Sequence, residues 1–134
     1  MTPEEEQELK QAEEYLAYWK PQLRLDHVDF EIVFSNPEES NGHLATCKIA
    51  WGRHRQKIEI RHPIERTERD KTVFRRDLEV VIVHELLHTK ETPWRDHPSV
   101  EKLFTDDKWL AGLHEDSLDA TAEALVRARR GITR

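Results

Sequence analysis

The chain has 134 residues, 36% of them charged, and a formal net charge of −6 at pH 7. This length predicts one domain, residues 1–134, with a single modest hydrophobic core. The acidic balance excludes a broad basic surface for nucleic acid, although short basic runs such as residues 53–57 leave a local patch open. No stretch approaches the ~20 apolar residues of a membrane span, so we expect no membrane partner.

Two further features indicate the cellular compartment. The N-terminal residues, MTPEEEQEL, are acidic and polar, unlike a secretory signal peptide. Cys47 is the only cysteine, which excludes an internal disulfide bond and fits a reducing compartment. We therefore expect a cytoplasmic protein.

The first predicted element is a helix that begins at Thr2-Pro3-Glu4-Glu5, a capping box with proline at the first helical position. Pro21 is expected to close it. Apolar residues recur along it at helical spacing, namely Leu9, Ala12, Leu16 and Trp19. The pattern is typical of a packing helix, and we assign no chemistry to it.

Alternating apolar and polar residues predict strands at 28–34, 43–51 and 56–62. A short turn between the second and third strands predicts an antiparallel hairpin. We expect a small, about three-stranded, mostly antiparallel sheet. The histidines of this region are expected at the surface or at strand ends rather than as metal ligands, and they are His43, His54 and His62.

The next predicted helix, from about Thr72 to Lys90, contains the main chemical motif of the chain, H-E-x-x-H. His84 and His88 are four residues apart and share one helix face, so both rings can reach one metal ion. A catalytic zinc takes three protein ligands and leaves one position for water, from which Glu85 could take a proton. The spacing favours metal-assisted hydrolysis with zinc as the cofactor.

Apolar residues cover most of this helix, and polar residues are confined to a sector that holds both histidines. Glu79 is the one exception. Buried polar groups need partners, and a metal ion would supply them. The alternative is a coincidental motif in a chain with 8 histidines. Thr92-Pro93 is expected to break the helix, and a short helix is possible near residues 100–104.

The last predicted helix runs from about Lys108 to Arg130 and is ended by Gly131. Its apolar stripe consists of Leu118, Ala122, Leu125 and Val126. Glu115 falls within this stripe, and a carboxylate that points at the core needs a cation, so Glu115 is the predicted third ligand. Asp119, one turn later, is predicted to hydrogen-bond the second ring nitrogen of a liganding histidine.

Two histidines remain alternatives for the third position. His97 lies in a proline-bounded loop nine residues after His88, and such a loop can bring a ligand to the site. His114 is next to Glu115 but points away from the centre of the stripe. Either could instead hydrogen-bond the oxyanion formed during hydrolysis.

With these residues, the chain resembles the zincin metallopeptidases over about residues 80–126. Residues 84–88 look like their active-site helix, and Glu115 with Asp119 is similar to the gluzincin pattern. The chain size resembles small phage- or bacterium-associated metallopeptidase-like proteins. His97-Pro98-Ser99 is similar to SprT-like proteins, in which a downstream histidine is the third ligand. The metzincin pattern, with a glycine and a third histidine soon after the motif, is absent.

The resemblance implies an α+β, minimal zincin-like fold: an N-terminal helix, a small sheet, the active-site helix and a C-terminal helix. It implies a zinc-dependent peptidase that acts on a peptide or protein, with zinc held by His84, His88 and Glu115. Glu85 would be the general base for a water that attacks a peptide carbonyl, and would pass the proton to the leaving amine. A substrate strand would lie along an exposed edge of the sheet.

Three other functions stay open. The chain could be a zinc-stabilised binding or regulatory domain without turnover, or an SprT-like protease that acts on DNA-bound proteins. Salt-sensitive DNA binding would favour the latter, although the acidic net charge makes a nucleic-acid partner unlikely. The third is a metal-free α+β interaction module with a coincidental motif.

Overall fold

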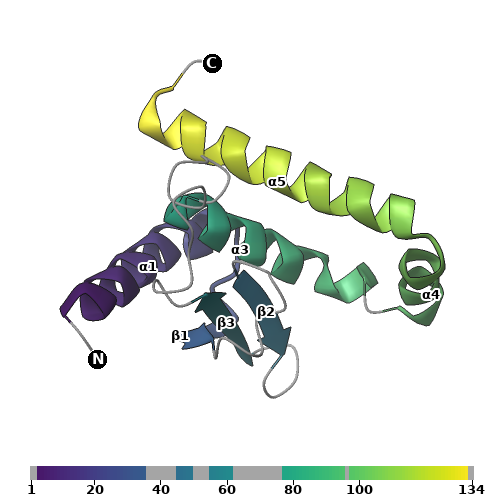
Figure 1. Ribbon diagram of the computed structural model, residues 1–134, viewed down its shortest axis with the longest axis horizontal. Helices are drawn as coiled ribbons and strands as arrows, with labels where there is room; N and C mark the ends of the chain where they lie inside the picture. The colour runs from purple at the N-terminus through teal and green to yellow at the C-terminus, as the bar shows by residue number, and fades with distance from the viewer. Residues whose placement is uncertain (1–2, 36–44, 50–54, 62–76, 96, 133–134) are drawn as a thin grey trace.

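The computed structural model describes residues 3–35, 45–49, 55–61, 77–95 and 97–132 (Figure 1). The described part of the chain has the α+β class that the sequence predicts, and it is mostly helical. Its elements are α1 (Pro3–Gln22), β1 (Asp29–Ser35), β2 (Ala45–Ile49), β3 (Arg55–Arg61), α3 (Leu78–Arg95), α4 (Pro98–Asp106) and α5 (Lys108–Arg130). Among these helices, none combines the length and apolar character that a membrane crossing requires.

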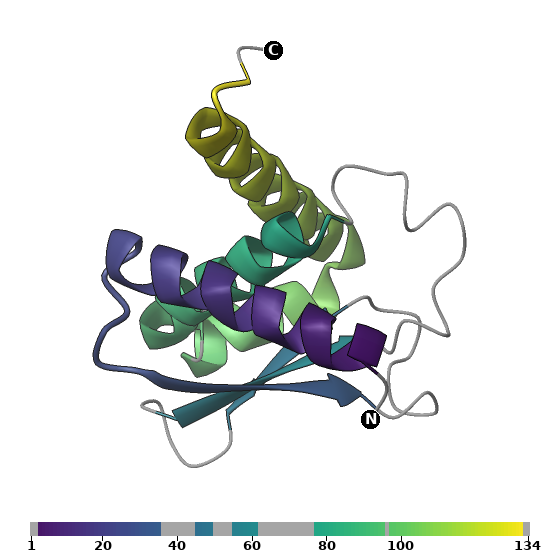
Figure 2. The ribbon, with the colours of Figure 1, turned by 90° about the vertical axis from the view of Figure 1, so that its left-hand side faces the viewer.

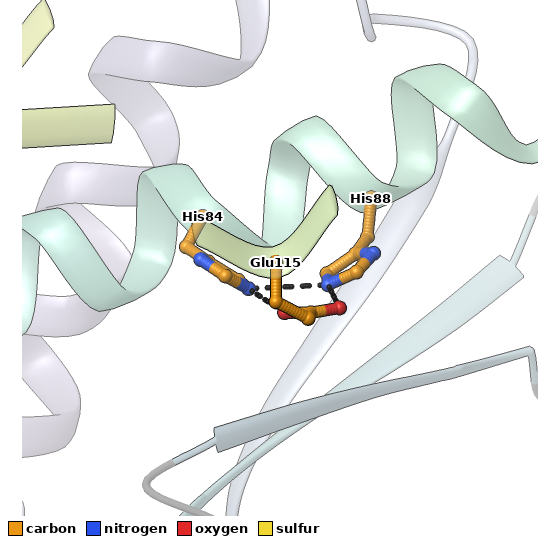
Figure 3. A group of neighbouring side chains, drawn as sticks. All are labelled: His84, His88 and Glu115. Carbon is orange, nitrogen blue, oxygen red and sulfur yellow. Dashed lines mark hydrogen bonds and ion pairs between the residues drawn. The ribbon is translucent and has the colours of Figure 1, made fainter. Parts of the chain in front are cut away.

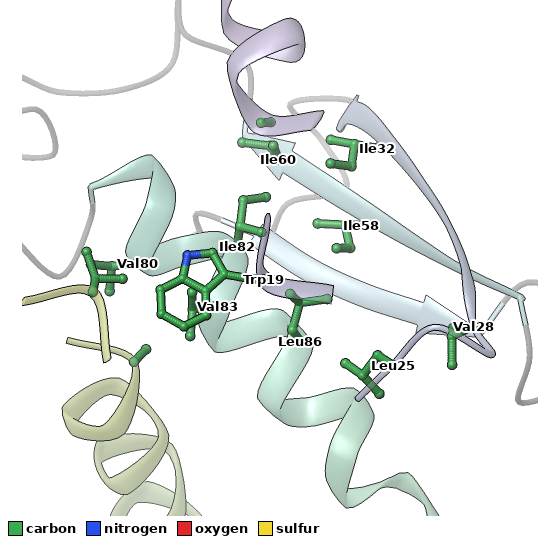
Figure 4. Close-up of a cluster of buried hydrophobic side chains, with 13 residues drawn as sticks. Trp19, Leu25, Val28, Ile32, Ile58, Ile60, Val80, Ile82, Val83 and Leu86 are labelled. Carbon is green, nitrogen blue, oxygen red and sulfur yellow. The ribbon is translucent and has the colours of Figure 1, made fainter. Parts of the chain in front are cut away.

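The elements stack in layers, with α3 between the sheet and α5 (Figures 1 and 2). α1 lies beside α3 on the same face of the sheet. This arrangement follows from the apolar residues that cover most of α3. Ile82 points towards the strands, whereas Val80 lies beside α5, and neither side chain is exposed (Figure 4).

The sheet has the strand order β1-β3-β2. The predicted antiparallel pairing of the second and third strands is confirmed, with Cys47 opposite Ile58. The expectation of a mostly antiparallel sheet is wrong, because β1 pairs in parallel with β3, with Ile32 opposite Ile58. An alternating pattern specifies which face of a strand is buried but not which neighbour it pairs with, so the sequence pattern did not predict this crossover.

The hydrophobic core lies between the sheet, α1 and α3 (Figure 4). The strands contribute Ile32, Ile58 and Ile60, and α1 contributes Ala12 and Trp19. Burial of each large aliphatic side chain stabilises the fold by roughly 1.5–3 kcal/mol. This packing holds α3, and therefore the motif that it carries, firmly against the sheet.

The ends of α1 and α3 differ from the predictions. Pro21 lies inside the last turn of α1, which ends at Gln22. α3 begins at Leu78, and the predicted residues 72–76 lie outside the described residues. The predicted break at residues 92–93 is wrong, because α3 continues to Arg95.

The last turn of α3 contacts α4 through Arg95. Its Nη1 lies 2.9 Å from Glu101 Oε2, and its guanidinium lies 4.1 Å from the centre of the Phe104 ring.

The last helix agrees with its predicted bounds. Asp107 caps the N-terminus of α5 by accepting a hydrogen bond from the main-chain N–H of Leu110 at 3.0 Å. Gly131 ends α5 in the left-handed conformation, with φ 74°. The predicted apolar stripe is buried against α3 through Leu118, Ala122 and Val126.

Candidate metal centre

Two histidines of α3 point into the space between α3 and α5 (Figure 3). The Nε2 atoms of His84 and His88 lie 3.1 Å apart, as their spacing of one turn predicts. Their side chains are 13% and 30% exposed, because α5 packs against the face of α3 that carries the imidazoles. Both rings therefore direct one nitrogen to a single point.

Glu115 reaches this point from α5 (Figure 3). Its Oε2 lies 3.0 Å from Nε2 of His84, and its Oε1 lies 3.1 Å from Nε2 of His88. Glu115 is three residues before Leu118, the first buried residue of the stripe, so the packing of α5 on α3 directs its carboxylate to the histidines. The structure thus brings together the three residues predicted as ligands.

The donor atoms fit a divalent ion. All of the ligand atoms lie within 4.8 Å of one another. Tetrahedral coordination with bonds of about 2.0–2.1 Å separates ligand atoms by about 3.4 Å, so a small opening of the cluster would admit an ion. Two imidazoles and one carboxylate are a common catalytic zinc set, but this set does not by itself identify the metal.

The electrostatics of the cluster favour a protonated imidazole in the absence of a metal ion. Burial acts to lower the pKa of His84, but its hydrogen bond with Glu115 and the nearby carboxylates outweigh burial and raise the pKa to about 9. Burial acts in the same way on His88, and the hydrogen bond with Glu115 again raises the pKa overall. Burial acts to raise the pKa of Glu115, whereas its hydrogen bonds with both histidines hold the pKa well below its ordinary value. A metal ion would have to displace this proton.

Glu85 is buried on the sheet side of α3, with 5% of its surface exposed. One turn later, the hydroxyl of Thr89 donates a hydrogen bond of 2.5 Å to Gln56 of β3, which shows that this side of the helix faces the sheet. Burial raises the pKa of Glu85, and the neighbouring His84 and His88 only partly oppose this shift. A carboxylate with a raised pKa is a stronger base near neutral pH.

Asp119 lies on the other side of the His84 ring, away from Glu115. Its Oδ1 is 2.8 Å from Nδ1 of His84, which is an ion-pair distance, although the ring nitrogen is not aligned for a hydrogen bond. A small rotation of the carboxylate would align the two groups for a hydrogen bond. This is the position predicted for a carboxylate that fixes which ring nitrogen faces an ion.

The structure brings neither rival histidine into the cluster. His97 precedes α4, where its Nδ1 accepts a hydrogen bond of 3.2 Å from the main-chain N–H of Ser99. His114 turns to Glu91, with 2.5 Å between Nε2 and Oε2, and its ring centre is 6.1 Å from that of His88. The other histidines considered, His43, His54 and His62, lie outside the described residues.

The sequence analysis missed Glu91 as a partner for His114. The signal was present, because Glu91 is three residues after His88 and so shares the face of α3 that carries the histidines. Glu79 was noticed only as an exception to the apolar pattern, and its partners could not be predicted.

Comparison with known proteins adds no relative, since no family model, curated protein or solved structure matches this chain.

Proposed function

We propose that this protein is a zinc-dependent peptidase in which Glu85 is the general base. The observation that carries the proposal is the convergence of Glu115, from a separate helix, on Nε2 of both motif histidines at 3.0–3.1 Å. A chance H-E-x-x-H sequence has no reason to meet a third ligand. Three protein ligands leave a coordination position for water or substrate, which is typical of catalytic rather than structural zinc sites.

The arrangement of elements supports the same proposal. The α+β elements follow the order that the resemblance implies, with a small sheet, then the helix that carries H-E-x-x-H, then a later helix that carries the proposed third ligand. Glu85 directly follows His84 in the chain, and the charges of His84, His88, Glu115 and Asp119 all act on the pKa of its buried carboxyl group. This electrostatic coupling supports the assignment of the general base to Glu85.

A bound zinc ion would supply the Lewis acidity that polarises a peptide carbonyl and makes a water molecule acidic. Glu85 would accept a proton from this water as its oxygen attacks the carbonyl carbon. Glu85 would then donate that proton to the leaving nitrogen as the C–N bond breaks. Its burial favours both steps, because a raised pKa suits a group that must take up and release a proton near neutral pH.

The substrate in this proposal is an extended peptide segment. β2 is an edge strand of the described sheet and contacts α3, whereas the other edge strand, β1, contacts α1. A peptide that adds to the outer edge of β2 by main-chain hydrogen bonds would therefore lie on the α3 side of the sheet. In this mode of binding, affinity comes mainly from the extended main chain of the substrate and less from its side chains.

Glu85→Gln tests the proposal. The amide keeps the size of the side chain but cannot accept the proton, so we expect unchanged zinc content and a loss of peptide hydrolysis of about 100-fold or more. Zinc is measured by elemental analysis, and hydrolysis by mass spectrometry of a mixture of unstructured peptides. Asp116→Asn is the matched control, because Asp116 is an exposed acid next to Glu115.

Hydrolysis by Glu85→Gln at the wild-type rate would contradict the proposal. A wild-type protein that binds zinc but cleaves no peptide would instead favour the zinc-stabilised binding domain. A protein that binds no metal and is stable in excess chelator would favour the metal-free module.

A further inference from the structure

A buried ionic junction joins α3 to α5 and α1, at the opposite end of the α3–α5 contact from Glu91 and His114. Its centre is Glu79, which is only 2% exposed. Glu79 Oε2 accepts a hydrogen bond of 2.7 Å from Trp19 Nε1 and another from Arg129. Its Oε1 accepts a hydrogen bond of 3.1 Å from Arg130 Nε.

Both arginines have a second partner that fixes their position. Arg130 Nη2 donates to Asp77 Oδ1 at 2.8 Å. The guanidinium of Arg129 lies over the ring of Tyr18 of α1, 3.6 Å from its centre. The C-terminal end of α5 is therefore held by the first turn of α3 and by α1 together.

A buried ionic junction of this kind contributes little net stability. A carboxylate loses most of its hydration when it is buried, and an apolar side chain of similar size often serves stability as well or better. Buried ionic groups are best supported as devices that select one alignment of two helices.

Apart from this junction, the candidate metal centre and the Glu91–His114 pair, the contact between α3 and α5 is formed by apolar residues. The buried residues are Val80 and Val83 on α3, with Leu118, Ala122 and Val126 on α5. Burial of apolar surface has no direction, and the three α5 residues are each one turn apart. If α5 slid by one turn, or about 5.4 Å, apolar groups would still face α3.

A slide of one turn would change the metal ligand. Glu115 and Asp119 are also one turn apart on α5, so such a slide would exchange their places beside the histidines. On the basis of the metal centre proposed above, we propose that Glu79 is a positioning residue: by holding Arg129 and Arg130, it fixes the alignment of α5 in which Glu115, and not Asp119, faces both Nε2 atoms.

Glu91 and His114 also restrain α5, at 2.5 Å. They lie next to the candidate ligands, so their substitution cannot separate alignment from the chemistry of the centre. Glu79 is five residues before His84, about 7.5 Å along the helix axis, and can be changed without a change to any ligand.

The experiment uses Glu79→Gln, which removes the charge but keeps an acceptor for Trp19. The first readout is Co²⁺ binding, followed by titration and by the visible absorption spectrum, which reports ligand geometry. We expect about tenfold weaker binding and an altered spectrum. In the wild-type background Glu115→Ala is expected to weaken binding about 100-fold or more. In the Glu79→Gln background, Glu115→Ala is expected to weaken Co²⁺ binding less than tenfold, because Asp119 can replace the lost ligand.

The second readout needs no metal. Spin labels at the exposed positions Lys90 and Thr121, in a Cys47→Ala background, report the distance between α3 and α5. We expect one narrow distance distribution with Glu79 present, and a broader or displaced one in Glu79→Gln. Glu101→Gln is the control, because it removes a surface carboxylate paired with Arg95, away from the α3–α5 contact.

An unchanged distance distribution and an unchanged spectrum in Glu79→Gln would overturn the inference. If Glu79→Gln does not fold, Arg130→Gln takes its place, because it loosens α5 but leaves Trp19 and Arg129 on Glu79. A wild-type protein that binds no Co²⁺ would count against the proposed metal centre, whereas the spin-label distances would still decide the question of alignment.

Discussion

Two places between α3 and α5 put a carboxylate opposite positively charged groups, and they differ in where that charge comes from. Glu79 is 2% exposed and faces the guanidinium groups of Arg129 and Arg130. The side chain of Glu115 is 50% exposed and faces the imidazoles of His84 and His88.

The two carboxylates differ in whether the charge of their partners can change. A guanidinium keeps its proton at every pH that a protein experiences, so the charge opposite Glu79 is permanent. An imidazole can release its proton, so the charge opposite Glu115 can be exchanged. The first arrangement is suited to holding helices together, and the second is suited to exchanging a proton for a metal ion.

The largest expected effect comes from removal of a ligand. His84→Ala and Glu115→Ala should each weaken zinc binding about 100-fold or more, which exceeds the usual effect of changing an outer partner. His97→Ala should leave zinc binding unchanged, because His97 serves as the cap of α4. Elemental analysis and competition with a chromophoric chelator measure both outcomes. Zinc lost from His97→Ala but retained by Glu115→Ala would show that the ligand set is wrong.

The next largest effect concerns the contribution of Glu79 to stability. Glu79→Ala should lower the free energy of unfolding of the metal-free protein by about 2–3 kcal/mol, because it removes the acceptor that Arg129, Arg130 and Trp19 share. This loss is smaller than the ~3–5 kcal/mol usual for a broken buried ion pair, since the arginines are about a third exposed and Arg130 keeps its contact with Asp77. Urea denaturation followed by circular dichroism measures the change. Glu115→Gln should lower the free energy of unfolding clearly less under the same conditions. Equal losses in the two variants would contradict the distinction between Glu79 and Glu115.

The grouping of His84, His88 and Glu115 was easier to predict from the sequence than the sheet, for a physical reason. The helical period fixes side-chain direction, so it placed both histidines on one face of α3 and aligned Glu115 with the apolar stripe of α5. Strand pairing depends on contacts between distant segments. The alternation of residues 28–34 therefore gave the buried face of β1 but not its parallel pairing with β3.

The ends of the helices and the polar partners show the same limit. A break at residues 92–93 was predicted from proline chemistry, but contacts of Arg95 with Glu101 and Phe104 accompany a helix that continues. Glu79 is a charged residue within the apolar pattern of its helix. Such a residue predicts that a buried partner exists but not which residue it is. Arg129 and Arg130 lie fifty residues or more away in the chain, beyond any local pattern.

A smaller effect is expected from pH. A rise in pH should lower the stability of the metal-free protein but increase its affinity for zinc. In the metal-free protein the pKa of His84 is raised from its ordinary value of 6.5 to about 9, because the hydrogen bond with Glu115 and the nearby carboxylates outweigh burial. Its contribution to stability is therefore complete below pH 6.5 and is lost as the pH rises through 9. The pKa of Glu115 is lowered, so its contribution is lost on the acid side instead.

Metal binding should respond in the other direction. Zinc requires the unprotonated imidazole, so its affinity should increase as the pH rises from 6.5 to about 9, with release of protons. Unfolding of the metal-free protein at pH 6.5 and pH 9, together with zinc titrations in buffers of different ionisation enthalpy, measures both trends. His84→Gln should remove most of the alkaline loss of stability. The same alkaline loss in this variant would assign the titration to another group.

The smallest expected effect tests the outer carboxylate. Asp119 Oδ1 lies 2.8 Å from Nδ1 of His84, where it favours a proton on that nitrogen and leaves Nε2 for an ion. Asp119→Asn keeps the shape but removes the charge, and should weaken zinc binding about tenfold without emptying the centre. Asp116→Asn, the neighbouring exposed acid, should have no effect on zinc affinity. If both variants bind zinc as tightly as the wild type, the Asp119 contact does not orient His84, and the three ligands hold their geometry through the packing of α5 on α3.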